Sequence, residues 1–229
     1  MTKLICLPYA GAGAGVYRPW RAMSTPRLEA VPIQLPGREE EYGAPFYATI
    51  AEAAEDIAGR IRAAVGTEPY SLFGHSFGSI LAYETTQQLI GHGGPLPEQI
   101  VVSGSVSPRH RERRLISADD DEQAVADLRD MVGQDIESLN HPDLRALLLP
   151  VLRADVKLLS DYEPAAGRAP LPIPLTAIRG DADVMVPVPE WRDWSAFTSA
   201  AFRELQMPGG HMYLADDWGL VWKTIEELL

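Results

Sequence analysis

Cysteine, long apolar runs and positive charge are all scarce in this sequence of 229 residues. The single cysteine, Cys6, cannot form an internal disulfide and lies in an apolar run, so we interpret it as a small buried side chain. So little cysteine fits a reducing compartment, and we expect a cytoplasmic protein. No apolar run approaches the ~20 residues that a membrane-spanning helix needs. Residues 1–3 lead directly into a strand pattern, so we also expect no signal peptide.

The shortage of positive charge restricts the possible partners. The chain carries 20 Lys and Arg against 32 Asp and Glu, a net charge of −12. Nucleic-acid binding needs clustered basic residues for phosphate contacts, so we expect no nucleic-acid partner. Apolar residues make up 46% and charged residues 23%, as in a globular protein. The length fits one α/β domain, which we expect to span residues 1–229.

The most informative stretch is Gly74-His75-Ser76-Phe77-Gly78. This G-x-S-x-G pattern follows an apolar run at 70–73 and precedes a helical pattern at 79–84. By itself the pattern also occurs in flexible loops, but a preceding strand and a following helix favour a nucleophile turn. Glycines on either side of the serine remove side chains that would collide in so tight a turn. Ser76 would then be exposed as a nucleophile, and the Phe77 amide at the helix start could bind an oxyanion.

Strand patterns recur along the chain and alternate with helical ones. Apolar or alternating segments predict strands at 4–7, 30–35, 70–73, 99–105, 174–180 and 202–207. Helical patterns occupy 47–65, 79–90, 191–199 and the residues from about 216 onwards. Apolar strands that alternate with helices predict an α/β fold whose mostly parallel central sheet has helices on both faces.

The alternation is interrupted between about 106 and 169, where no strand pattern occurs. Helical periodicity at 122–132 and 143–161 predicts a helical insertion, which is a candidate lid over the site. The acidic run at 119–122 could suggest a metal site, but acidic residues also favour a helix start, and we expect no metal. His110 and His141 have no partner pattern, and we interpret both as surface residues.

The order of polar residues matches the Ser…Asp…His order of α/β-hydrolases. His211 follows the last predicted strand, directly after Gly209 and Gly210, where it could take the proton of Ser76. An aspartate would hold the imidazole in the required tautomer. Asp181 and Asp183 both follow the strand at 174–180. We favour Asp183 as the acid because it lies beyond the closing turn of the strand, and we expect Asp181 to brace that turn.

A loop of small residues at 8–15 follows the first strand. It contains G-x-G, but it lacks the P-loop Lys-Ser/Thr and the third glycine of a dinucleotide site. A loop after an early strand commonly supplies the second amide of an oxyanion hole. We expect Ala10 to provide that amide beside Phe77, with Gly11 as the alternative.

Taken together, these motifs resemble the type II thioesterases of polyketide and nonribosomal peptide biosynthesis, over nearly the whole chain. The segments that carry the resemblance lie at 7–11, 17–20, 34–39, 74–78, 149–155 and 209–211. The resemblance implies an α/β-hydrolase with a helical lid. It also implies hydrolysis of acyl groups from the phosphopantetheine thiol of acyl or peptidyl carrier proteins, which clears stalled or misprimed carriers or releases intermediates. No cofactor is implied beyond the phosphopantetheine of the substrate.

Three other functions stay open at this stage. A general carboxylester hydrolase would use the same triad. A transferase or cyclase would use an alcohol or amine in place of water. A non-catalytic module would bind carrier proteins without hydrolysing their thioesters. A basic cluster at the start of the insertion could dock an acidic carrier, or it could be a solvated turn. The cluster comprises Arg109, Arg111, Arg113 and Arg114. We expect a monomer.

Overall fold

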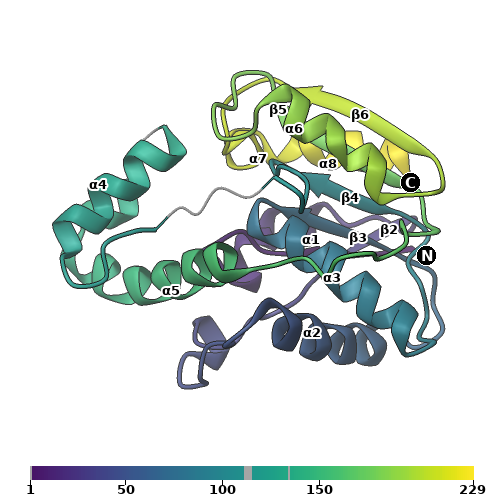
Figure 1. The fold of residues 1–229 in the computed structure, drawn as a ribbon, viewed down its shortest axis with the longest axis horizontal. Coiled ribbons are helices and arrows are strands. Elements are labelled where there is room, and N and C mark those ends of the chain that lie inside the picture. The colour runs from purple at the N-terminus through teal and green to yellow at the C-terminus, as the bar shows by residue number, and fades with distance from the viewer. Residues whose placement is uncertain (1, 111–114, 134) are drawn as a thin grey trace.

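The structure is a computed structural model, and it describes residues 2–110, 115–133 and 135–229. At its centre lies a six-stranded sheet in the order β2-β1-β3-β4-β5-β6 (Figure 1). Every neighbouring pair is parallel. The strands are β1 Thr2–Leu7, β2 Leu28–Pro32, β3 Tyr70–His75, β4 Ile100–Ser103, β5 Leu175–Gly180 and β6 Phe202–Met207. The predicted parallel sheet is therefore confirmed.

One predicted strand is displaced along the chain. The pattern predicts a strand at 30–35, whereas β2 begins at Leu28 and ends at Pro32. Within the described residues, β2 is an edge strand paired with β1 alone, and the pairing ends at Cys6 and Pro32. The apolar residues that follow are buried without belonging to the ladder, because Ile33 and Leu35 pack into the core.

The two faces of the sheet bury alternate residues of each strand, as the strand period of two requires. On one face, Ile5 and Leu72 pack with α2 (Ile50–Val65) and α3 (Phe77–Gly91). On the other face, Leu4 and Phe73 pack with α1 (Arg18–Met23) and α8 (Trp218–Leu228). Helices thus cover both faces, as predicted, and Cys6 is fully buried in the second core.

The helical insertion lies between β4 and β5. It consists of α4 (Asp121–Val132), the 3-10 helix η3 (Glu137–Asn140) and α5 (Pro142–Asp161). Asp120 caps α4 by accepting the Gln123 amide, so the acidic run is a helix start. The insertion has a small core of its own and extends beyond the sheet in Figure 1. The described part of 106–169 contains no strand, and its action as a lid remains a prediction.

The shorter helices refine the remaining predictions. The predicted helix at 191–199 is α6 (Val188–Arg192) followed by η4 (Asp193–Phe197). The last predicted helix, from about 216 onwards, is α8, whose first turn Asp217 caps by accepting the Leu220 amide. The short helix α7 (Tyr213–Asp216) precedes it and was not predicted. Two 3-10 turns, η1 (Ala14–Tyr17) and η2 (Glu39–Glu41), complete the described elements.

Candidate active site

The turn between β3 and α3 holds Ser76 in a strained conformation. Ser76 has φ 52° and ψ −115°, outside the regions that L-residues favour. A Cβ on Gly74 would come within 2.0 Å of the Gly78 carbonyl oxygen. A Cβ on Gly78 would come within 2.3 Å of the Leu7 carbonyl oxygen at the end of β1. Both glycines are therefore required by backbone contacts, and the serine is presented at the carboxyl edge of the sheet.

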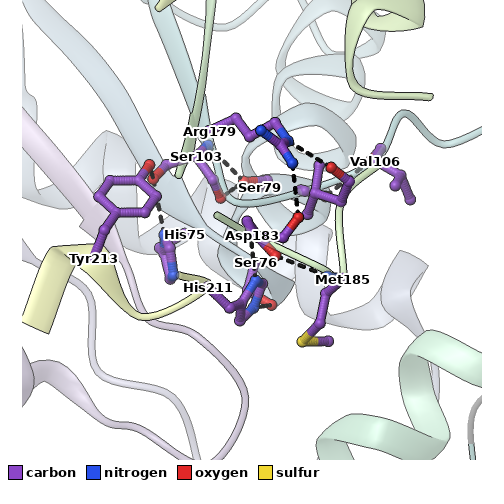
Figure 2. Close-up of polar contacts among 12 residues, drawn as sticks. His75, Ser76, Ser79, Ser103, Val106, Arg179, Asp183, Met185, His211 and Tyr213 are labelled. Carbon is purple, nitrogen blue, oxygen red and sulfur yellow. Dashed lines mark hydrogen bonds and ion pairs between the residues drawn. The ribbon is translucent and has the colours of Figure 1, made fainter. Parts of the chain in front are cut away.

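The structure brings together the three residues that the sequence predicts for a triad (Figure 2). The Ser76 hydroxyl lies 3.1 Å from Nε2 of His211, and Nδ1 of His211 lies 2.9 Å from Oδ2 of Asp183. Asp183 and His211 are only 1% and 5% exposed. Because the buried carboxylate accepts from Nδ1–H, Nε2 is left to accept the serine proton.

The Asp183 carboxylate is kept ionised by its surroundings. Burial alone would raise its pKa, but the hydrogen bond and charge of His211, with the Met185 amide, outweigh burial and lower it. The Met185 N–H donates to Oδ1 at 2.9 Å, which occupies the oxygen that does not face His211. An ionised carboxylate at this place can stabilise the imidazolium that forms when His211 takes a proton.

Asp181 contacts the loop that carries His211 but not the imidazole. Its Oδ1 accepts the Gly209 amide at 2.9 Å, which braces the turn as the sequence suggests. Buried Arg179, on β5, adds a support that sequence reasoning missed, since its guanidinium donates to the carbonyls of Asp181, Asp183 and Val186. Arg179 is an ordinary strand residue in the sequence, and only the fold reveals this role.

A second histidine, His75, lies next to His211. His75 is fully buried, and its ring centre lies 5.4 Å from that of His211. Its Nδ1 is hydrogen-bonded at 2.8 Å to the Ser103 hydroxyl, which contacts the Tyr213 hydroxyl (Figure 2). Burial, followed by repulsion from His211, lowers the pKa of His75 to about 3. A neutral His75 leaves the triad without a competing cation.

Hydrogen bonds of the loop at 8–15 distinguish its two candidate oxyanion donors, the amides of Ala10 and Gly11. The Gly11 amide donates to Oδ2 of Asp155 at 2.8 Å and is therefore occupied. Among the residues that the structure describes, the Ala10 amide donates to no acceptor. The geometry thus favours Ala10 over Gly11 as the partner of the Phe77 amide.

A cavity of about 130 Å³ opens beside Ser76 and His211. Much of its wall is apolar, and the insertion contributes Leu159 at the end of α5. His110 also lines the cavity, and its Nε2 lies 3.1 Å from Asp193. The interpretation of His110 as a plain surface residue is therefore incomplete. Its contact with Asp193 joins segments more than eighty residues apart, so no local sequence pattern indicates it.

Of the predicted basic cluster, only Arg109 lies among the described residues. Its guanidinium pairs with Asp193 at 2.9 Å and lies over the ring of Phe197, with the centroid 5.6 Å away. Arg111, Arg113 and Arg114 lie outside the described residues. Docking by the cluster therefore remains a prediction.

Comparison with known proteins decides the family. A family profile described as the thioesterase domain matches residues 2–229. The chain belongs to the thioesterase family. This thioesterase is 33% identical to thioesterase PikA5 of Streptomyces venezuelae, over 99% of its own length and 80% of PikA5. It therefore has the α/β-hydrolase fold and is a hydrolase.

Solved structures agree with this assignment. The thioesterase matches RedJ, from the prodiginine biosynthetic pathway of Streptomyces coelicolor, with a TM-score of 0.91 and 31% identity. That match covers 100% of the thioesterase and 90% of RedJ. BorB, the type II thioesterase of the borrelidin biosynthetic cluster, matches with a TM-score of 0.84 and 33% identity, over 99% and 91% of the two chains. In the part of the thioesterase that the structure describes, no helix is long and apolar enough to cross a membrane.

Proposed function

We propose that this thioesterase hydrolyses acyl groups from the phosphopantetheine thiol of carrier proteins in a polyketide or nonribosomal peptide pathway. The observation that carries the proposal is the Ser76–His211–Asp183 chain of hydrogen bonds beside a cavity. Relatives from the prodiginine pathway and the borrelidin cluster support the pathway context. A cytoplasmic location and a monomeric state remain predictions from the sequence.

Acylation would proceed by nucleophilic attack. Nε2 of His211 takes the Ser76 proton as Oγ attacks the thioester carbonyl carbon, and Asp183 stabilises the resulting imidazolium. The Ala10 and Phe77 amides hold the oxyanion, and each such donor typically lowers the barrier by ~3 kcal/mol. When the tetrahedral intermediate collapses, the C–S bond breaks and His211 returns the proton to the departing thiolate.

Deacylation would repeat these steps with water. His211 takes a proton from a water molecule, whose oxygen attacks the acyl-serine carbonyl. The C–O bond to Ser76 then breaks, and the serine oxygen recovers the proton from His211. The products are a free acid and the carrier thiol, so neither a metal nor a cofactor is required.

Intact-protein mass spectrometry of an acylated carrier protein tests the proposal. Wild-type protein should remove the acyl group, and Ser76→Ala should lower the rate by at least about 10⁴-fold. Ser199→Ala is the matched control, because its hydroxyl bonds the Leu171 carbonyl away from the cavity. It should act like the wild type.

The other outcomes separate the alternative functions. Turnover of small esters without turnover of carriers would replace the proposal with a general carboxylester hydrolase. A product carrying an alcohol or amine would indicate a transferase or cyclase. Carrier binding without turnover in either protein would indicate a binding module.

A further inference from the structure

The loop at 8–15 is held in place by side chains from other parts of the chain. Its own residues are mostly alanine and glycine, which offer no polar side chains for that purpose. The supporting bonds are Gly11 N–H to Asp155 (2.8 Å), Arg38 to the Ala12 carbonyl (3.1 Å), Ala14 N–H to Gln34 (3.0 Å) and Gly15 N–H to Glu39 (2.9 Å). Three of these side chains come from the segment after β2, and the fourth comes from the insertion.

Asp155 and Arg38 form a buried, two-pronged ion pair. The two guanidinium nitrogens of Arg38 lie 2.6 and 2.8 Å from the two carboxylate oxygens of Asp155. The side chain of Arg38 is 6% exposed and that of Asp155 is 1% exposed. The Asp155 oxygen nearer to Arg38 Nη1 also accepts the Gly11 amide, so one carboxylate ties together three segments of the chain. Charge-assisted, bidentate bonds of this kind fix geometry well.

Helix α5 also contacts the same loop through an apolar side chain. Leu152 lies one turn before Asp155, on the same face of the helix. A Cβ on Gly11 would come within 2.5 Å of Leu152 Cδ2, so the bare glycine lies directly against leucine. The segments 34–39 and 149–155 are thus spatial neighbours, and Gly11 with its φ of 82° is clamped between them.

From these contacts we propose that Asp155, paired with Arg38, is a positioning residue for the oxyanion hole. It engages the Gly11 amide and fixes the adjacent peptide, so that Ala10 is the loop amide left to face the developing oxyanion. The inference rests on the proposed function, in which Ser76 attacks and Ala10 stabilises the intermediate. Asp155 touches no reacting atom and acts only through the loop.

Two double variants test whether the oxygen of Asp155 matters apart from the ion pair. Arg38→Met/Asp155→Asn and Arg38→Met/Asp155→Leu both remove the charges and keep similar volumes. Apolar replacement of a buried ion pair is often neutral for stability, so the leucine variant should fold. The asparagine variant should fold as well, because its oxygen can still accept the Gly11 amide. Only the asparagine variant retains an oxygen that can accept the Gly11 amide. If the leucine variant does not fold, Arg38→Met/Asp155→Ala takes its place, because alanine also lacks the oxygen.

The readouts are kcat and KM with a small thioester, the inhibition constant of a trifluoromethyl ketone, and the melting temperature. The ketone forms an oxyanion on Ser76 and therefore reports on the hole. Relative to the asparagine variant, the leucine variant should lose ~10²-fold in kcat, as expected for loss of one oxyanion donor. KM should stay within threefold, and ketone affinity should fall by the same factor as kcat/KM.

Equal kcat and equal ketone affinity in the two double variants would overturn the positioning role. Ser76→Ala, measured in the same assay, separates this failure from failure of the proposed function. An inactive Ser76→Ala with equal double variants rejects only the positioning role. An active Ser76→Ala rejects the nucleophile assignment and, with it, the oxyanion argument.

Discussion

The turn at 74–78 and the loop at 8–15 touch at Gly78 but are stabilised in opposite ways. The turn is fixed by its own backbone, since its glycines lie against main-chain atoms of the turn and of the end of β1. The loop is fixed by side chains that reach it from residues 34–39 and from α5. One half of the proposed oxyanion hole is therefore a local property of the sequence, whereas the other half depends on distant residues.

The largest expected effect on kcat distinguishes Asp183, which bonds the imidazole of His211, from Asp181, which supports the loop. Asp183→Asn should lower kcat by about 10⁴-fold, because an amide favours the wrong tautomer of His211. Asp181→Asn should lower kcat less than tenfold, because its oxygen can still accept the Gly209 amide. Steady-state kinetics on one thioester measures both. A deeper loss for Asp181→Asn would reverse the assignment of the acid.

The next effect compares two glycines that have close neighbours of different kinds. Gly74→Ala places its Cβ 2.0 Å from a backbone oxygen, whereas Gly13→Ala meets the end of the Glu39 side chain at 2.5 Å. Backbone cannot yield without moving Ser76, and misplacement by about 1 Å can cost 10²-fold in rate. We expect Gly74→Ala to lose at least 10²-fold in kcat/KM or to fail to fold. Gly13→Ala should lose less than tenfold, because a flexible carboxylate can move. Equal losses of kcat/KM in the two variants would contradict the conclusion that backbone contacts fix the turn whereas side chains fix the loop.

The last comparison concerns the pH dependence of stability and the histidine inside the turn. The pKa of His75 is about 3 in the folded protein and about 6.5 when unfolded. Below pH 6.5 the unfolded chain binds a proton that the folded protein excludes, so stability falls as pH falls, until about pH 3. The slope is about 1.4 kcal/mol per pH unit, or ~3 kcal/mol between pH 6.5 and 4.5.

Urea unfolding at several pH values measures this dependence. His75→Asn should lose that part of the slope, while His141→Asn, at an exposed site, should keep it. Stopping at pH 4.5 avoids most of the protonation of Asp183. Because folding lowers the pKa of Asp183, its protonation also removes stability as pH falls, but at lower pH. An unchanged slope in His75→Asn would mean that His75 binds its proton equally in both states.

Sequence reasoning succeeded where a pattern is local. Strand periodicity and the G-x-S-x-G turn predicted the sheet and placed Ser76 at its edge, and chain order placed Asp183 and His211 within reach. It did not find the supports that join distant segments, such as Arg38 with Asp155, which are 117 residues apart. Both residues lie in segments that carry the family resemblance, 34–39 and 149–155, but neither segment indicates that the two side chains pair. Their pairing follows only from the path of α5 across the fold. Both ends of β2 were misplaced for a related reason, since pairing with β1, and not hydropathy, decides where an edge strand begins and ends.

The attachment of Asp155 to α5 links the insertion to chemistry in a thermodynamic sense. If α5 shifts, the carboxylate that holds the Gly11 amide shifts with it, so the position of the insertion and the affinity for an oxyanion share one free energy. Such coupling is reciprocal. If a partner prefers one position of the insertion, its binding changes the affinity of the hole for an oxyanion by some factor. An oxyanion in the hole then changes the affinity of the insertion for that partner by the same factor.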